Sequence, residues 1–218
     1  MFTEYTDHLF SFASAGPLED EIRRARAAFF ADVKDVYAEE EFFEERINAF
    51  LEWYCLDRTI GTTGKTPLAL FLEASHGALK DDELSYLEGL SRSRHAIAEL
   101  TRVSEGRVDV RDVFTGDRFA VTERRPLVTL RPGDLCETRL VAYKGETHFT
   151  RTFLVHPREA RRTSLREIRR AAKELRLDAP ALMRTLGVLW VRAHRYKGVD
   201  PHDLYSPAEL AKPNKPLA

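Results

Sequence analysis

The sequence has few of the residues that mark disulfide-rich, collagenous or disordered proteins. Among its 218 residues there are 2 cysteines, 10 prolines and 11 glycines, and this composition excludes all three classes. Long apolar runs are also missing. The longest stretch without a charged side chain, His8–Leu18, has 11 residues, whereas a membrane-spanning helix needs about 20. Because Glu4 and Asp7 stand where a secretory signal would carry positive charge, we expect a cytoplasmic protein without a membrane segment.

Recognisable catalytic motifs are missing as well. The seven histidines show no spacing typical of a metal site, and neither Gly-x-Ser-x-Gly nor Gly-x-Gly-x-x-Gly occurs. Cys55 and Cys136 lie in apolar contexts and form no Cys-x-x-Cys pair, so each is expected to be a small buried hydrophobic residue. The sequence therefore predicts no metal and no cofactor, offers no catalytic residue, and favours a protein that is not an enzyme.

Charge is plentiful, but the two signs are unevenly distributed along the chain. Residues 1–90 carry 19 acidic and 8 basic side chains, whereas residues 158–218 carry 7 acidic and 14 basic ones. A basic C-terminal part indicates either an anionic partner or an internal contact with the acidic N-terminal part. The near cancellation of the totals, 34 Lys and Arg against 35 Asp and Glu, favours the internal contact.

The spacing of apolar residues predicts helices, then strands, then helices again. In residues 17–93 apolar side chains recur every three or four positions, which is typical of helices. From about residue 96 to residue 155 they alternate, and Pro132-Gly133 and Lys144-Gly145 mark turns between short strands. Helical spacing returns after residue 158, where Ser164 and Glu167 match a capping box.

These patterns predict an α+β fold. We expect an N-terminal helical layer, a small antiparallel β-sheet or barrel of five to six strands, and a C-terminal helix pair. The helical region corresponds to residues 1–95, the sheet or barrel to residues 96–157, and the helix pair with its tail to residues 158–218. The three parts are expected to form one integrated unit.

The string from Thr59 to Thr66 ends like a P-loop. In a P-loop, glycine amides surround phosphate groups, a lysine neutralises them and a hydroxyl binds magnesium, so Gly64, Lys65 and Thr66 are candidate phosphate-binding residues. However, Thr59 stands where the first glycine is required, and the string follows a predicted helix rather than a strand. We favour a linker in which Thr66 caps the next helix and Pro67 is its first residue, and we expect no nucleotide binding.

A basic stripe runs along the first C-terminal helix. It consists of Arg161, Arg162, Arg166, Arg169, Arg170 and Lys173. These side chains could neutralise the phosphates of a nucleic acid, or they could dock on the acidic helices around residues 39–45. Because the N-terminal half is acidic, we favour docking and keep nucleic-acid binding as the alternative.

The strand-rich segment offers a second route to nucleic acid. Barrels that bind oligonucleotides stack bases on exposed aromatic rings in a positive groove, and Phe119, Tyr143, Phe149 and Phe153 are available here. Aromatic residues at strand spacing are more often part of the core, and we favour that interpretation.

Three segments carry a resemblance to other proteins. They are Phe50–Arg58 followed by Gly61-Thr62, Val108–Gly116, and Pro132–Leu135 before an Arg-Leu-Val strand. They resemble a group of uncharacterised bacterial proteins, and the resemblance covers about residues 42–157. The shared motifs are structural and imply no activity. Some similar proteins carry a cysteine-rich zinc tail, which this chain does not have, so the resemblance implies no metal here.

Together these observations favour a non-enzymatic binding or adaptor protein that acts through protein–protein surfaces on an unidentified protein partner. The alternative is a nucleic-acid-binding protein that uses the basic stripe and the barrel face. A weaker alternative is nucleotide binding through Gly64, Lys65 and Thr66. The exposure of the basic stripe is the observation that best distinguishes the first two.

Overall fold

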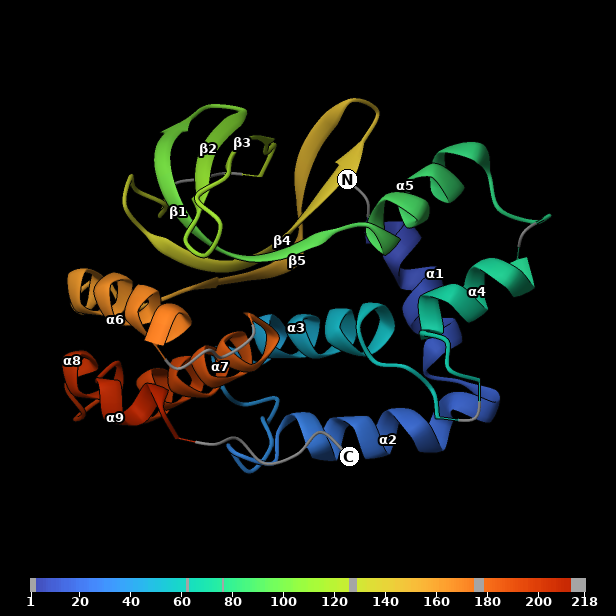
Figure 1. Cartoon of the computed structure of the whole chain (residues 1–218). Coiled ribbons are helices and arrows are strands. Elements are labelled where there is room, and N and C mark those ends of the chain that lie inside the picture. Colours follow the sequence, from blue (N-terminus) through green and yellow to red (C-terminus); the bar gives the residue numbers. More distant parts are fainter. Residues whose placement is uncertain (1–2, 62, 76, 126–128, 175–178, 213–218) are drawn as a thin grey trace. The chain divides into compact units, whose positions relative to one another are not determined.

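The computed structural model describes residues 3–61, 63–75, 77–125, 129–174 and 179–212, with side chains except at residues 3, 171–174 and 179 (Figure 1). Five strands and a larger number of helices confirm the α+β class. The strands are β1 (Arg94–Ser104), β2 (Arg107–Asp112), β3 (Arg118–Thr122), β4 (Leu135–Tyr143) and β5 (Glu146–Val155). The N-terminal helices are α1 (Thr3–Ala13), the 3-10 turn η1 (Gly16–Leu18), α2 (Glu19–Phe29), α3 (Phe43–Leu56), α4 (Pro67–Ser75) and α5 (Asp81–Ser91). The C-terminal helices are α6 (Arg161–Glu174), α7 (Ala179–Arg195), α8 (Pro201–Leu204) and α9 (Pro207–Leu210).

The chain divides into two units. Unit 1 comprises Met1–Arg94, Val141–Glu146 and Pro216–Ala218, so it holds α1 to α5 and the tip of the β4–β5 hairpin. Unit 2 comprises His95–Leu140 and Thr147–Lys215 and holds most of the sheet with α6 to α9. Unit 1 has 11 basic and 20 acidic side chains, net −9, and unit 2 has 23 basic and 15 acidic ones, net +8. The charge asymmetry of the sequence is therefore a difference between two folded units.

Unit 1 contains a helix that the sequence analysis missed. We read the segment around His8 only as an uncharged stretch, yet Thr3–Ala13 forms α1. Tyr5, Leu9 and Phe12 fall at helical spacing, and Leu9 is fully buried. The ring of Tyr5 lies 5.9 Å from that of Tyr86 in α5. This spacing was the signal that could have predicted the helix.

The predicted helix start at Thr66 and Pro67 agrees with the structure, whereas the one predicted by the capping box at Ser164 is wrong. The Thr66 hydroxyl accepts a hydrogen bond from the Ala69 amide at 3.2 Å, and α4 begins at Pro67. Helix α6 starts at Arg161, about one turn before the predicted capping box. Ser164 is therefore inside the helix, where its hydroxyl donates to the carbonyl of Ala160 at 2.8 Å.

The strands of unit 2 form a closed barrel in the order β1-β2-β3-β5-β4. The β1–β2 and β2–β3 pairs are antiparallel, as expected, but β3 pairs with β5 in parallel. A five-stranded Greek-key barrel with this order is the topology of the OB fold. Its interior is filled by a cluster of apolar residues, namely Ala98, Leu100, Val108, Val110, Val121, Cys136, Leu140 and Phe149.

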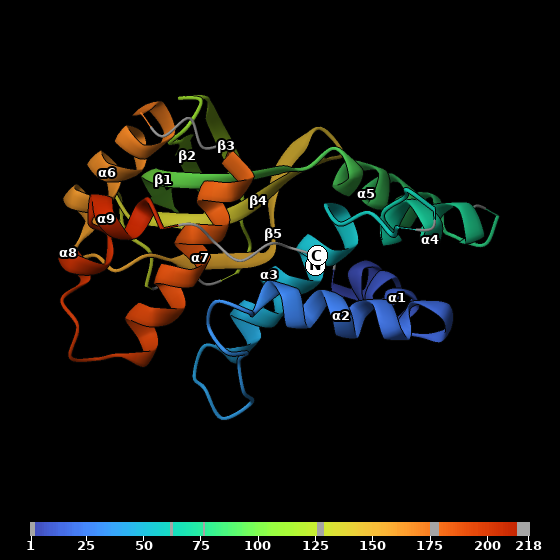
Figure 2. The ribbon, with the colours of Figure 1, turned by 60° about the horizontal axis from the view of Figure 1, so that its bottom comes forward.

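The C-terminal helices lie against this barrel (Figure 2). Ile97, Val113 and Leu135 of the barrel region share a core with residues from α6 to α9. The fully buried Tyr205, which follows α8, is joined to His156 after β5 by a hydrogen bond of 2.7 Å between its hydroxyl and Nδ1. The short helices α8 and α9 were not predicted, although Asp200-Pro201 and Ser206-Pro207 are cap-and-proline starts that could have indicated them.

At Gly89, α5 packs closely against the tip of the β4–β5 hairpin within unit 1. A Cβ atom at Gly89 would lie 2.5 Å from the carbonyl oxygen of Ala142. Alanine normally stabilises a helix relative to glycine by up to about 1 kcal/mol, but here the clash should dominate. We expect Gly89→Ala to lower the free energy of unfolding by about 1–3 kcal/mol, the range of overpacked sites, as measured by urea denaturation. Gly61→Ala, where nothing lies within 4 Å, is the control, and an equal or stabilising effect at Gly89 would contradict the packing.

Candidate functional site

A buried carboxylate anchors the turn between β3 and β4 to the segment before α6. Asp134 is 3% exposed, and its oxygens accept hydrogen bonds from Nε and Nη2 of Arg158, both at 2.6 Å. The amide of Arg131 donates a third bond at 2.8 Å. Burial raises the pKa of Asp134, but these hydrogen bonds outweigh it and hold the pKa below its usual value. The charged form of Asp134 thus fixes the turn.

Glu99 on β1 joins the barrel to α6. Its side chain is 11% exposed and hydrogen bonds to Nη2 of Arg111 on β2. Two arginines of α6 approach the same carboxylate, with Nη2 of Arg161 at 3.6 Å and Nη2 of Arg169 at 3.9 Å. Three guanidinium groups from two elements therefore converge on one carboxylate.

The outer face of β1 to β3 adds more arginines. Along β2, Arg107, Asp109 and Arg111 alternate with buried residues and therefore share the outer face. The register places Arg118 of β3 opposite Arg111, and Arg102 of β1 opposite Asp109. Arg107 pairs with Asp109 at 2.8 Å. Four arginines, Arg102, Arg107, Arg111 and Arg118, thus share the outer face of these strands with Glu99 and Asp109.

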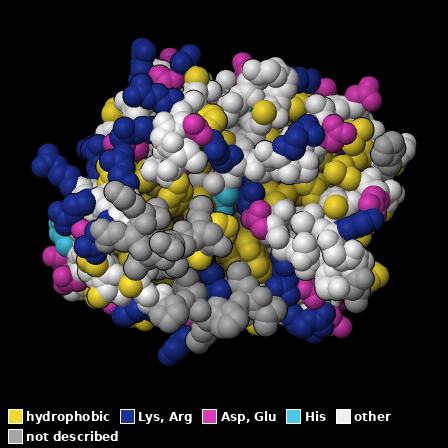
Figure 3. Space-filling model, in the orientation of Figure 1, with side chains coloured by type: hydrophobic (Ala, Val, Ile, Leu, Met, Phe, Trp, Pro, Cys, Tyr) yellow, Lys and Arg dark blue, Asp and Glu magenta, His cyan; other side chains and the backbone are white. Residues whose placement is uncertain are grey.

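We call the combined set the arginine surface. It consists of Arg102, Arg107, Arg111 and Arg118 on the barrel and Arg161, Arg162, Arg166, Arg169 and Arg170 on α6. Figure 3 shows Lys and Arg side chains gathered over α6 and the adjoining edge of the barrel. The ion pairs of the described residues join these arginines to Glu99, Asp109 and Glu167. The surface therefore has an excess of positive charge.

The structure brings together five members of the predicted basic stripe. Arg166 is 73% exposed and Arg170 is 43% exposed, and both pair with Glu167 of the same helix. Arg161 and Arg169 pair with Glu99, as described above. Among the described residues, no carboxylate pairs with Arg162. The side chain of Lys173 lies outside the described residues. Glu99 and Glu167 both belong to unit 2, and docking on residues 39–45 stays a prediction.

The barrel aromatics do not form an exposed stacking platform. Phe149 is buried, and Phe119 and Phe153 are partly buried against the barrel core. Tyr143 is 8% exposed and packs edge-on against Tyr86 in unit 1. Phe149 and Tyr143 are thus buried, whereas Phe119 and Phe153 lie at the margin of the barrel core.

The P-loop-like string forms a tight turn in unit 1. The amides of Thr63 and Gly64 donate to the carbonyl of Ile60 at 3.0 and 2.8 Å. Nζ of Lys65 pairs with Glu73 at 2.6 Å, and Thr66 caps α4. These groups are engaged within the turn and its neighbouring helix. The expectation that Gly64, Lys65 and Thr66 bind no nucleotide stays a prediction.

In the described part of the chain, neither the cysteines nor a cluster of metal-binding side chains forms a candidate site. Cys55 and Cys136 are both fully buried, and burial raises the pKa of each thiol, which keeps it protonated at neutral pH. Over the described ranges, no group of three or more His, Cys, Asp or Glu side chains is placed to hold a metal ion. Likewise, no helix within them has the length and apolar character to cross a membrane.

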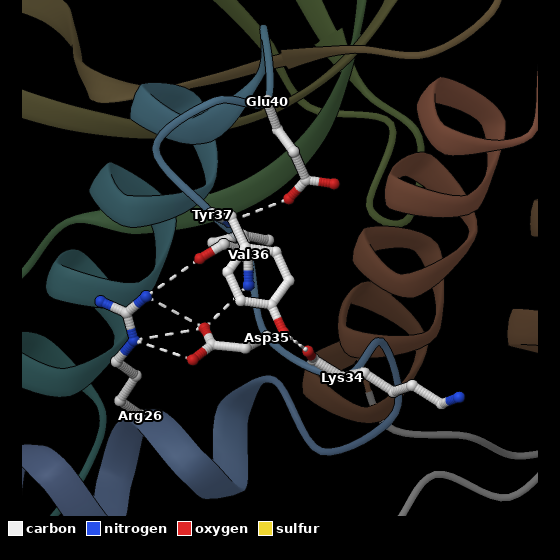
Figure 4. Close-up of polar contacts among 6 residues, drawn as sticks. All are labelled: Arg26, Lys34, Asp35, Val36, Tyr37 and Glu40. Carbon is white, nitrogen blue, oxygen red and sulfur yellow. Dashed lines mark hydrogen bonds and ion pairs between the residues drawn. The ribbon is translucent and has the colours of Figure 1, made fainter.

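A loop of unit 1 is held in an unusual backbone conformation (Figure 4). Lys34 and Asp35 have φ values of 62° and 72°, which costs roughly 1–2 kcal/mol for each non-glycine residue. Arg26 of α2 stabilises this conformation, because Nε and Nη2 donate to Oδ1 of Asp35 at 3.2 and 3.0 Å and Nη2 also donates to the carbonyl of Val36 at 3.1 Å. Val36 is 1% exposed and anchors the loop in the core.

The same loop displays a tyrosine. Tyr37 is 57% exposed, yet its hydroxyl donates to the carbonyl of Lys34 at 3.1 Å and its amide donates to Oε2 of Glu40 at 2.9 Å (Figure 4). The ring is thus exposed and fixed at the same time. Sequence reasoning missed this residue, because the strained conformation at Lys34 and Asp35 has no glycine to signal it.

Fold and site together define an α+β protein with an OB-type barrel and an exposed arginine surface. The chain belongs to the family of unknown function DUF7986, which it matches over residues 19–200. This match is consistent with a resemblance to uncharacterised proteins, and it spans more of the chain than residues 42–157. No curated protein and no solved structure matches the chain.

Asp134 gives a pH-dependent test of the turn. Because its pKa is lowered in the folded state, its charged form contributes stability that is present above about pH 4 and lost as pH falls further. We expect Asp134→Asn to lower the free energy of unfolding by about 1–3 kcal/mol at neutral pH and by much less near pH 3. Urea denaturation at the two pH values measures this. Asp109→Asn, which removes a more exposed carboxylate, should cost under about 1 kcal/mol, and equal losses in both variants would contradict the assignment.

Proposed function

We propose that this protein is a non-enzymatic binding module whose unit 2 binds nucleic acid through the arginine surface. The observation that carries the proposal is the continuity of that surface, because Glu99 brings arginines of β2 and α6 to one point. Arginine donates in a planar fork that matches phosphate oxygens and keeps its charge at any physiological pH. We further propose a bacterial and cytoplasmic setting, where nucleic acid is accessible.

Two features support contacts with the phosphate backbone rather than with bases. The nine arginines outnumber the carboxylates Glu99, Asp109 and Glu167 with which the described part of the surface pairs them, so an approaching polyanion meets an attractive field. The barrel aromatics that could stack on single-stranded bases are buried or partly buried. By analogy with other OB barrels, whose ligands bind over strands 2 and 3, β2 and β3 are the appropriate face, although fold alone does not determine function.

Salt dependence tests this proposal. Each neutralised phosphate releases bound counterion, so about four contacts on duplex DNA should give a log–log slope of affinity against salt near −3.6, at roughly 0.9 per phosphate. We expect the triple variant Arg162/Arg166/Arg170→Gln to bind more weakly and to reduce the magnitude of that slope by up to about 2.7. Fluorescence anisotropy with a labelled duplex, and with a single strand of the same sequence, measures both quantities.

A matched triple variant controls for net charge. Arg23, Lys80 and Arg92 of unit 1 are exposed, and their replacement by Gln removes the same charge from the other unit. It should leave the slope unchanged. Absence of saturable binding at low salt, or an equal loss in both triple variants, would exclude a nucleic-acid site on the arginine surface.

The braced loop of unit 1 favours a second function, binding of a protein partner. Tyrosine supplies a large contact area and is enriched at interface hot spots. Tyr37 is exposed while the backbone beside it is held by Arg26 and Asp35. Such a fixed ring loses little conformational freedom on binding, which supports the adaptor role that the sequence favoured.

Tyr196 provides a control for the loop, since it is 56% exposed in unit 2. We expect affinity purification with the wild type to recover a partner protein, and Tyr196→Ala to retain it. Tyr37→Ala should lose this partner or bind it at least about tenfold more weakly, which corresponds to a loss of 1.4 kcal/mol or more in binding free energy. Mass spectrometry and titration of the recovered partner measure this. Equal retention by both variants would argue against the loop as an interface.

A further inference from the structure

The three arginines around Glu99 lie at different distances from its carboxylate. Arg111 hydrogen bonds to it, whereas Arg161 at 3.6 Å and Arg169 at 3.9 Å are within ion-pair range but beyond hydrogen-bond distance. The guanidinium groups of Arg161 and Arg169 are therefore attracted to Glu99 without donating to it. Their side chains are 42% and 45% exposed, so an anion from solvent has access to both.

Arg161 is positioned by a glycine that leaves room for it. A Cβ atom at Gly133 would lie 1.9 Å from Cζ of Arg161 and 2.0 Å from each terminal nitrogen. The guanidinium group thus rests directly against the backbone of the Pro132–Asp134 turn. Gly133 has a φ of +91°, and the adjacent Asp134 is held by Arg158. This support lowers the conformational freedom that Arg161 would lose on binding a ligand.

We propose that Arg111, Arg161 and Arg169 form the main phosphate-binding site of the arginine surface, and that Glu99 occupies it in the free protein. The proposal rests on the nucleic-acid function proposed above. A backbone phosphate binds to the exposed sides of Arg161 and Arg169, and it competes with Glu99 for their positive charge. Like-charge repulsion between the carboxylate and the phosphate weakens binding at this point.

Several structural features favour this site over the other arginines. Glu99 is the only carboxylate of the arginine surface that faces arginines from both the barrel and α6 in the described part of the chain. Three convergent guanidinium groups can satisfy more than one phosphate oxygen, whereas Arg107 stands beside Asp109 as a single pair. Two of the arginines are also preorganised. The backbone at Gly133 supports Arg161, and the hydrogen bond to Glu99 orients Arg111.

The test is the neutral replacement Glu99→Gln in the full chain, studied by anisotropy with the labelled duplex across a salt series. We expect affinity to rise by about three- to tenfold near physiological salt. The salt slope should steepen by roughly 0.9, the equivalent of one more phosphate contact. Thermal unfolding of the variant checks that α6 remains attached to the barrel.

Two further variants separate the site from a general charge effect. Asp109→Asn removes one negative charge from the same surface but only from the single pair with Arg107, and it should raise affinity by less than about twofold. In the double variant Glu99→Gln/Arg161→Gln the gain should disappear, because one of the three phosphate ligands is lost. Gly133→Ala, which displaces the guanidinium group of Arg161, should weaken binding as Arg161→Gln does.

The outcomes distinguish this inference from the proposed function. Wild-type binding with equal gains in Glu99→Gln and Asp109→Asn, or with no gain in Glu99→Gln, would overturn the Glu99 site and leave the proposed function standing. No binding by the wild type and by Glu99→Gln at low salt would overturn both. A gain in Glu99→Gln that needs Arg161 supports the site.

Discussion

Unit 2 depends on one electrostatic constraint: carboxylates that are withdrawn from water need cationic partners. A buried carboxylate without a partner would cost several kcal/mol, and Glu99, Asp134 and Glu167 are all buried residues. Arginines supply the partners, and most of them come from α6 or from the segment directly before it. Ion pairs with buried carboxylates therefore attach α6 to the barrel, in addition to the shared apolar core.

The same arginines remain accessible to solvent. A long side chain can direct one edge of its guanidinium group to a carboxylate and leave the other edge exposed. The exposed fractions of 40–45% at Arg158, Arg161 and Arg169 reflect this division. Structural pairing and anion recognition are thus compatible in one set of residues, and the excess of arginines over carboxylates determines how much charge is left for a ligand.

Much of the fold could be predicted from residue periodicity, but the site could be predicted only in part. The α+β class, the turns at Gly133 and Gly145, and the cap at Thr66 followed from local patterns. The partnership of Glu99 with Arg161 and Arg169 joins residues about 60–70 positions apart in the chain, and no local pattern encodes it. The parallel pairing of β3 with β5 is a long-range feature of the same kind. The strained loop at Lys34 and Asp35 was missed because non-glycine residues adopt it through a tertiary contact with Arg26.

The β4–β5 hairpin is divided between the units, since Val141–Glu146 belongs to unit 1 while the flanking strand residues belong to unit 2. In unit 1 this tip contacts α5, where Ala142 lies against Gly89 and Lys144 pairs with Asp82 at 2.7 Å. A fragment that ended at Arg94 would uncover the α5 surface at Gly89 and Tyr86, which the tip covers. Neither unit is thus a continuous stretch of chain, and limited proteolysis near residue 94 would not release an intact unit 1.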